Sequence, residues 1–257
     1  MTLAAQPSTI DLSGEVALVT GASSGLGRHF ALTLAAHGAT VVAAGRRHDR
    51  LADVVAQIVD AGGSATAVPI DVTDHDSILA GFSAIEAQVG HPTILVNNAG
   101  IPDAQRATKM SVELIDQVIG TNLRGPYIVA CEFARRLMAE KRGGRIVNIS
   151  SMAAFDYDGN GAALYSITKA AVNRMTEALA VEWARFDINV NAIAPGVFNS
   201  EMTDGMLKRI ADPREHFPRR RIGDADQLES TLLYLVSPAS GFVTGTVIKV
   251  DDGQQSR

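Results

Sequence analysis

Tyr165 and Lys169 stand four residues apart in a stretch of sequence with helical periodicity. Residues at this spacing share one face of a helix, so the lysine charge can lower a tyrosine pKa that is about 10 in a free side chain. A tyrosine tuned in this way is a general acid or base. Ser150 and Ser151 end a predicted strand upstream of this pair, at the edge of a sheet where ligands commonly bind.

A glycine-rich turn joins the first predicted strand to the first predicted helix. Gly21, Gly25 and Gly27 occur there with the spacing GxxxGxG. We expect Gly21 to allow the tight turn, Gly25 to let the backbone approach a pyrophosphate, and Gly27 to let helix and strand pack closely. The helix N-terminus adds unpaired N–H groups and the positive end of a dipole. The turn therefore predicts a dinucleotide site.

The end of the second predicted strand indicates which dinucleotide binds. An acidic residue commonly contacts the ribose 2′-hydroxyl at this position. Here the position is Gly45, and Arg46 and Arg47 follow it. Because a carboxylate is missing and two guanidinium groups are present, a 2′-phosphate is favoured. We predict NADP(H) as the cofactor, with Arg46 as the main contact; the alternative is that the arginines only begin a solvated helix.

Short apolar runs alternate with longer amphipathic stretches along the chain. The apolar runs predict strands at Val16–Thr20, Thr40–Ala44, Ala65–Ile70, Thr93–Asn97, Arg145–Ser150, Asn189–Ala194 and Val247–Val250. The stretches between them predict helices at Leu26–His37, Asp49–Ala61, Asp74–Val89, Val112–Lys141, Ala163–Arg185 and Asp226–Val236. This alternation predicts a single α/β domain over residues 1–257, a doubly wound, Rossmann-type parallel sheet of about seven strands with helices on both faces.

One segment, residues 196–224, breaks the alternation at the carboxyl edge of the sheet. We interpret it as a substrate lid, and the alternative is a plain surface loop. An uncharged ketone or secondary alcohol with apolar, even bulky, substituents is expected beneath it. The expected wall of this pocket is apolar or aromatic and comprises Met152, Phe155, Tyr157, Val197, Phe198, Met202 and Met206. Arg219–Arg221 is interpreted as a hinge, with the arginines in a solvated loop or in a salt bridge to a neighbouring subunit, and the alternative is a site for an anionic substrate.

Composition narrows the class of protein. Hydrophobic residues make up 46% of the 257 residues, which is enough for a large core, and the net charge of −5 argues against nucleic acid as a partner. Cys131 is the only cysteine, and no secretory signal or membrane span is recognisable, so we expect a cytoplasmic protein. The six histidines lack close ligand spacing, so we expect no catalytic metal.

Taken together, these motifs resemble those of the short-chain dehydrogenase/reductase family over nearly the whole chain. The matching segments are TGxxxGxG at Thr20–Gly27, Asp71-Val72, NNAG at Asn97–Gly100, Asn122, the Ser151/Tyr165/Lys169 set, Pro195-Gly196 and Ser200. One departure is the separation of Ser151 from Tyr165, which is 14 residues. The family usually has 12 or 13, and we assign the extra residue to Phe155–Gly161.

The resemblance implies a role for each matching residue. Tyr165 would exchange a proton with the substrate oxygen, and Ser151 would hydrogen-bond that oxygen as charge develops on it. Lys169 would hold the nicotinamide ribose and lower the tyrosine pKa, and Asn122 would help to place a water in a proton relay. The cofactor contacts expected on this basis are Gly21, Ser23, Ser24, Gly25, Leu26, Gly27, Arg46, Arg47, Asp71, Val72, Asn98, Ala99, Gly100, Tyr165, Lys169, Pro195, Gly196, Val197 and Ser200.

The resemblance also implies a reaction, hydride transfer between NADP(H) and a ketone or secondary alcohol, as in an alcohol dehydrogenase or carbonyl reductase. Two other functions stay open: reduction of a 3-oxoacyl thioester, and nucleotide sensing without turnover, for which four catalytic residues would be unnecessary. We expect a homotetramer in which the long helices after the fourth and fifth strands pack against partner copies. The alanine-rich face of Ala163–Ala184 suits that contact.

Overall fold

The computed structural model of the chain describes residues 10–103, 105–157, 159, 161–207 and 212–255. Its sheet has seven parallel strands in the order β3-β2-β1-β4-β5-β6-β7. The strands are β1 Val16–Thr20, β2 Thr40–Gly45, β3 Ser64–Pro69, β4 Ile94–Asn97, β5 Gly144–Ile149, β6 Ile188–Pro195 and β7 Val247–Val250. The order reverses between β1 and β4, and ligands bind open α/β sheets in the crevice outside the carboxyl ends at such a point.

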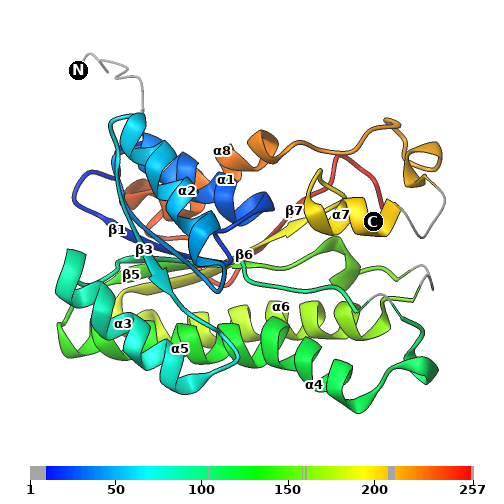
Figure 1. Ribbon diagram of the computed structural model, residues 1–257, viewed down its shortest axis with the longest axis horizontal. Coiled ribbons are helices and arrows are strands. Elements are labelled where there is room, and N and C mark those ends of the chain that lie inside the picture. The colour runs from blue at the N-terminus through cyan, green and yellow to red at the C-terminus, as the bar shows by residue number, and fades with distance from the viewer. Residues whose placement is uncertain (1–9, 104, 158, 160, 208–211, 256–257) are drawn as a thin grey trace.

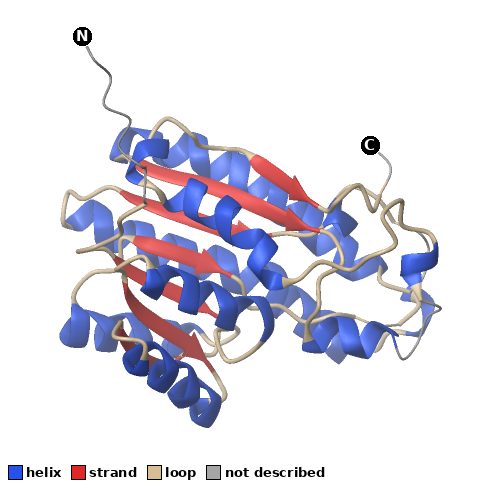
Figure 2. Cartoon of the chain, turned by 90° about the horizontal axis from the view of Figure 1, so that it is seen from above, coloured by secondary structure: helices blue, strands red, loops and turns tan. Residues whose placement is uncertain are grey.

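Helices cover both faces of this sheet (Figure 1). They are α1 Gly25–Ala36, α2 His48–Asp60, α3 His75–Val89, α4 Val112–Ile119, α5 Gly125–Ala139, α6 Ala163–Trp183, α7 Glu201–Leu207 and α8 Glu229–Val236. In Figure 2 the strand arrowheads point toward a region of short helices and loops, which in Figure 1 includes α7. The doubly wound fold predicted from the alternation of elements is confirmed.

Two hydrophobic clusters hold the layers together, one on each face of the sheet. Phe30 of α1, Leu51 of α2 and Leu232 of α8 are fully buried in the first cluster. Phe82 of α3 and Phe133 of α5 are buried in the second, to which α6 also contributes. Side chains of alternate sheet residues enter opposite clusters, because successive strand residues point to opposite faces. This explains the continuous apolar runs of the strands.

The predicted helix over Val112–Lys141 is not continuous. A π-helical segment, Gly120–Arg124, separates α4 from α5, and Pro126 lies in the first turn of α5. A proline has no N–H for the carbonyl four residues earlier, and its ring clashes with that carbonyl, which here belongs to Asn122. The chain therefore widens at this point. Such π-bulges often occur at functional sites, so the interruption draws attention to Asn122.

Candidate active site

The glycine-rich turn between β1 and α1 is tightly packed. Gly21 has φ +67° and Gly25 has φ +52°, conformations that favour glycine. A Cβ on Gly27 would lie 2.4 Å from the Gly21 carbonyl oxygen, so only glycine lets α1 start this close to the strand. A Cβ on Gly25 would meet only Ser200, at 3.6 Å. The expected roles of the three glycines agree with this geometry, and Leu26 packs against the core.

The loop after β4 is fastened to the same turn. Asn98 donates from Nδ2 to the carbonyl oxygens of Thr20 (3.1 Å) and Gly21 (3.3 Å). The Thr20 hydroxyl accepts the backbone N–H groups of Asn98 and Ala99 at 3.1 and 3.2 Å. Gly100 follows, and a Cβ there would lie 3.7 Å from Lys169 Nζ. The NNAG segment therefore links the phosphate turn to the candidate catalytic lysine.

The two arginines after β2 face different partners. Arg47 donates to Ser23 Oγ (2.9 Å) and Ser24 Oγ (2.5 Å), and so closes over the phosphate turn. Arg46 instead lines a cavity of about 390 Å³ with Thr73 and Arg124. The sequence predicted Arg46 as the main contact, but the structure places Arg47 against the serines of the turn.

Asp71 interacts with Arg46 and Thr73, two of the residues that line this cavity. Its Oδ1 accepts hydrogen bonds from the backbone N–H and the hydroxyl of Thr73, at 2.9 and 2.7 Å. Burial acts to raise the pKa of Asp71, but these hydrogen bonds and the Arg46 charge outweigh it and hold the pKa below its usual value. Asp71 therefore presents a fixed negative charge, and the adjacent Val72 is buried. Both residues were expected to contact the cofactor.

The candidate proton donor lies in the first turn of α6. The Ser151 side chain lies close enough to the Tyr165 phenol to lower its pKa as a hydrogen-bonding neighbour, so the extra residue of the 14-residue separation does not part them. The Ser150 hydroxyl instead bonds Asn173 Oδ1 of α6 at 2.6 Å. The geometry thus favours Ser151 over Ser150 as the residue beside the reacting oxygen.

Lys169 is buried one turn after Tyr165, with Nζ 5.6 Å from the centre of the tyrosine ring. Nζ donates to the Ile149 carbonyl oxygen at 2.7 Å. Burial lowers the pKa of Lys169 from 10.5 to about 8. Burial also raises the pKa of Tyr165 above 10; the Ser151 hydrogen bond opposes this and the Asp103 charge adds to it. The predicted lowering of the tyrosine pKa is therefore wrong for this state, because burial is the largest cause and the lysine charge is not among the causes.

Asn122 holds the loop that follows NNAG. Its Oδ1 accepts the backbone N–H of Ile101 and its Nδ2 donates to the Ile101 carbonyl, both at 2.8 Å. The side chain is fully buried in the π-helical segment. Both ends of the Asn122 amide are hydrogen-bonded to Ile101. If Asn122 takes part in a water relay, its main-chain carbonyl would therefore bind the water. The residue four positions later is Pro126, which has no N–H to donate to that carbonyl.

Asp103 lies beside the catalytic pair and was missed in the sequence. Its Oδ2 accepts the backbone N–H of Tyr165 at 3.0 Å, and so caps the start of α6. The residue is 2% exposed, and its Oδ1 has no hydrogen-bond partner among the described residues. A single aspartate in a loop carries no sign of burial in the sequence. Its sequence position, soon after the NNAG segment, was the only available signal.

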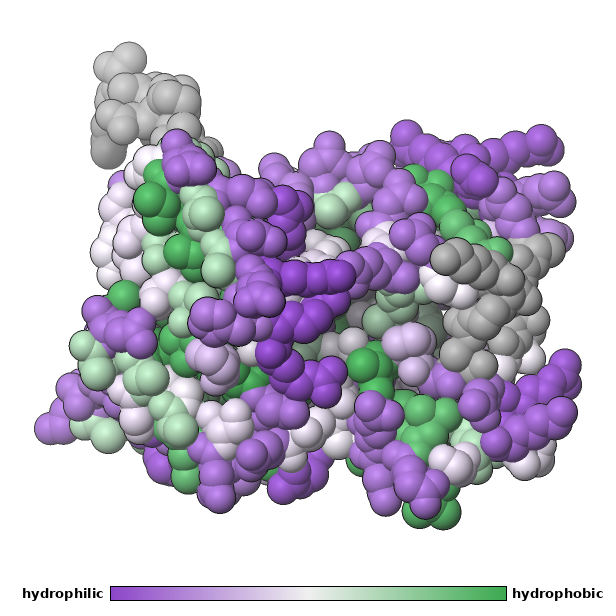
Figure 3. Space-filling view, viewed as in Figure 1, coloured by the Kyte–Doolittle hydropathy of each residue, from purple (hydrophilic) through white to green (hydrophobic). Residues whose placement is uncertain are grey.

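The predicted apolar pocket wall does not assemble as one surface. Phe198 is buried in the core, where its ring contacts Gly223, and Met152 is also buried. Phe155 is exposed, with Lys249 Nζ 4.0 Å from its ring centre. Tyr157 and Met202 are exposed as well, and the side chain of Met206 lies outside the described residues. In Figure 3, hydrophobic residues reach the surface between α7 and α4.

The lid segment is anchored by the end of the chain. Gln254 Oε1 accepts the backbone N–H of Val197 at 2.6 Å, and Gly196 donates to the Val250 carbonyl at 2.9 Å. Arg219 and Arg221 pair with Asp252 at 3.0 and 2.6 Å. The salt-bridged interpretation of the arginine cluster therefore agrees with the geometry, although its partner belongs to the same chain. The Pro195-Gly196 turn lies next to these contacts, and Ser200 lies beside Gly25.

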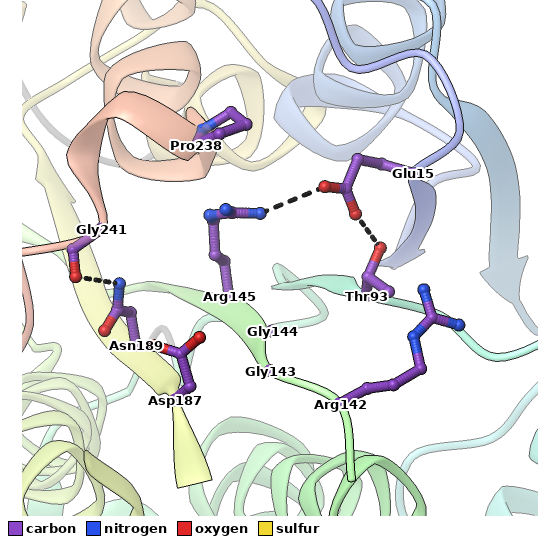
Figure 4. A pocket seen from close by; sticks show the side chains of 10 residues that line it. All are labelled: Glu15, Thr93, Arg142, Gly143, Gly144, Arg145, Asp187, Asn189, Pro238 and Gly241. Atoms are coloured by element: carbon purple, nitrogen blue, oxygen red, sulfur yellow. Dashed lines mark hydrogen bonds and ion pairs between the residues drawn. The ribbon is translucent and has the colours of Figure 1, made fainter. Parts of the chain in front are cut away.

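A second cavity, of about 370 Å³, lies at the opposite edge of the sheet (Figure 4). Arg145 pairs there with Glu15, whose other oxygen accepts a hydrogen bond from Thr93. None of the residues predicted to be functional lines this cavity. The candidate site is therefore the carboxyl edge, where the glycine turn, the NNAG loop and α6 meet.

The turn fits a dinucleotide on structural grounds. Gly21 and Gly27 leave no room for a Cβ, whereas Gly25 is open toward Ser200. Arg46 and Arg47 supply positive charge at the end of β2, and Gly45 carries no acid that would repel a phosphate. The same residues therefore combine a close backbone approach with charge for an anionic cofactor.

Comparison with known proteins identifies the family. The profile described as short chain dehydrogenase matches residues 15–210. The chain belongs to the short-chain dehydrogenase family. This short-chain dehydrogenase is an oxidoreductase, and its predicted family resemblance is confirmed.

Two curated relatives and one solved structure illustrate the range of the family. The chain is 36% identical over 253 residues to gluconate 5-dehydrogenase of Gluconobacter oxydans, covering 96% of the chain and 97% of the relative. It is 37% identical over 247 residues to 3-oxoacyl-[acyl-carrier-protein] reductase of Aquifex aeolicus, covering 95% and 98%. A gluconate 5-dehydrogenase from Burkholderia cenocepacia, solved with NADP and tartrate, superposes with TM-score 0.89 at 33% identity, covering 95% and 96%.

Two negative findings concern the described residues only. They contain no group of three or more His, Cys, Asp or Glu side chains arranged to hold a metal ion. None of their helices combines the length and apolarity of a membrane span.

Proposed function

We propose that this short-chain dehydrogenase uses NADP(H) to interconvert a ketone and a secondary alcohol. The observation that carries the proposal is the grouping of three side chains, with Ser151 beside the Tyr165 phenol and the Lys169 ammonium 5.6 Å from the centre of the tyrosine ring. The choice of NADP(H) is supported by Arg46 and Arg47 at the end of β2 and by the NADP in the Burkholderia relative.

The site residues divide the work of the reaction. NADP(H) supplies or accepts the hydride when it is bound, so the protein contributes position and electrostatics. Tyr165 donates its phenolic proton to the carbonyl oxygen during reduction, because its raised pKa keeps it protonated at neutral pH. Ser151 hydrogen-bonds the same oxygen. Lys169, with a pKa of about 8, is mostly charged at pH 7 and would bind the ribose hydroxyls.

For the substrate we propose a hydroxylated keto acid and its alcohol. The gluconate 5-dehydrogenase relatives support this class, as does Lys249 at the rim beside Phe155, where its charge could meet a carboxylate. The apolar ketone expected from the sequence rested on a wall that the described side chains do not form. A 3-oxoacyl thioester is the second candidate, because the Aquifex aeolicus relative is a reductase of that kind at similar identity.

NADPH oxidation against three substrates tests both proposals. A 5-keto sugar acid, a 3-oxoacyl thioester and an aryl alkyl ketone are compared by kcat/KM, and the sugar acid is expected to be preferred. Tyr165→Phe keeps the ring but removes the proton, so activity should fall by roughly 10²–10⁴-fold while NADPH binding persists. A near-normal kcat in that variant would refute the mechanism, and a preference for either other substrate would replace the sugar acid.

We also propose a single domain with residues 196–224 as its lid, working as a homotetramer in the cytoplasm. Exposed apolar side chains on the outer face of α5 and α6, including Tyr127, Ile167 and Val181, support the assembly. The single Cys131 supports a reducing compartment.

A further inference from the structure

The lid helix α7 begins with a carboxylate that reaches the end of β2. Glu201 pairs with Arg47 at 3.3 Å and with Arg50 at 2.5 Å, although it lies about 150 residues away from both in sequence. All three side chains are roughly half exposed, so a soluble ligand can reach them. Hydrogen bonds from Arg50 and then Arg47 hold the pKa of Glu201 below its usual value, so the carboxylate is ionised at neutral pH.

The same guanidinium belongs to the phosphate turn. Arg47 bonds Ser23 Oγ at 2.9 Å and Ser24 Oγ at 2.5 Å while it pairs with Glu201. The residue before Glu201 is Ser200, whose Cβ would lie 3.6 Å from a Cβ on Gly25. The start of α7 therefore lies directly on the turn. The Glu201 carboxylate occupies the guanidinium surface that an incoming anion would use.

A carboxylate and a phosphate compete for arginine because both offer oxygens to the same fork of N–H donors. The 2′-phosphate of NADP(H) is the anion expected at the end of β2, and NADH lacks it. Two anions cannot share Arg47 and Arg50 without repulsion. Binding of the 2′-phosphate should therefore displace the Glu201 carboxylate from these arginines.

We propose that Glu201 is a specificity-determining residue that stands in for the cofactor 2′-phosphate on Arg47 and Arg50. Its displacement breaks the ion pairs that join the start of α7 to Arg47 and Arg50. The carboxylate weakens binding of NADP(H) and leaves NAD(H) almost unaffected. This inference rests on the proposed use of NADP(H).

Calorimetric titration with fragments of the cofactor tests this without turnover. Adenosine 2′,5′-bisphosphate carries the 2′-phosphate, and ADP does not. Glu201→Gln should lower the Kd for the 2′,5′-bisphosphate about fivefold, equivalent to roughly 1 kcal/mol, and change the Kd for ADP less than twofold. Asp204→Asn is the matched control, because Asp204 is exposed on the same helix and forms no ion pair with the described residues. It should change neither Kd.

Three results would overturn the inference: an unchanged or raised Kd for the 2′,5′-bisphosphate in Glu201→Gln, an equal gain for ADP, or an equal gain in Asp204→Asn. The last two would mean that the lost charge acts at long range rather than on one phosphate. The wild-type measurement distinguishes failure of this inference from failure of the proposed function. If the wild type and the Glu201→Gln variant both bind the 2′,5′-bisphosphate no more tightly than ADP, both proposals fail. If the wild type prefers the bisphosphate, only the inference is at stake.

Discussion

Replacing the buried lysine of the active site should change the stability of the protein in a way that reverses with pH. Lys169→Met keeps the length of the side chain and removes its charge. Burial lowers the pKa of Lys169 from 10.5 to about 8, so holding the charged form costs folding free energy. Because one pKa unit is about 1.36 kcal/mol, the cost is roughly 3 kcal/mol wherever the lysine is charged in both states.

The sign follows from proton binding. Below pH 8 the folded and unfolded lysines are both protonated, so the cost is fully present. Between about pH 8 and pH 10.5 the unfolded state binds more protons, and the wild type gains stability as pH rises. The Lys169→Met variant does not have this cost. It does leave the Ile149 carbonyl without the hydrogen bond from Nζ, which lowers the free energy of unfolding by about 1–3 kcal/mol at every pH.

The two stability curves should therefore cross. Near pH 7 the variant should be as stable as the wild type or more stable by up to about 2 kcal/mol, and above pH 10.5 it should be less stable by about 1–3 kcal/mol. Urea unfolding of both proteins without cofactor, from pH 7 to pH 11, measures the difference, in which other titrations cancel. A difference that stays constant over this range would show that Lys169 is not held in a desolvated site.

Three other changes test the site and the assembly. Asp103→Asn keeps the cap on α6 but removes the charge that raises the Tyr165 pKa, so the alkaline rise in alcohol oxidation should move to lower pH; an unmoved profile would contradict this. Gly45→Asp with Arg46→Ile places a carboxylate near Ser23 and should shift the kcat/KM preference toward NADH, unless wild type already uses both equally. Ile167→Glu charges an exposed apolar face, so light scattering should show a smaller particle than the tetramer that we propose for the wild type.

Local patterns in the sequence predicted most of the fold because their causes are local. The strands β1 and β7 begin and end as predicted. The apolar run of β1 is typical of a strand buried on both faces, whereas β7 lies at the edge of the sheet and exposes Lys249. Asp74, the first residue of the predicted helix, caps α3 through the N–H of Asp76. One exception was the predicted helix over Val112–Lys141, where helix-favouring residues concealed the effect of Pro126, and another was α7, which was not predicted within residues 196–224.

The site was predictable where it depends on spacing and unpredictable where it depends on distant contacts. Tyr165 and Lys169 share a helix, so their juxtaposition follows from four residues of separation. The direction of the tyrosine pKa shift does not, because it depends on burial and on Asp103, 62 residues away. Phe198 faces the core rather than the ligand for the same reason: residues distant in sequence, such as Gly223, decide which side of the lid is covered.

The attachment of the lid to the last residues of the chain bears on how the protein can be handled. Gln254 hydrogen-bonds Val197, and Asp252 pairs with Arg219 and Arg221. These contacts attach both ends of the proposed lid to residues 252–254. A purification tag or fusion partner joined after these residues would pull on the segment that we propose as the substrate lid.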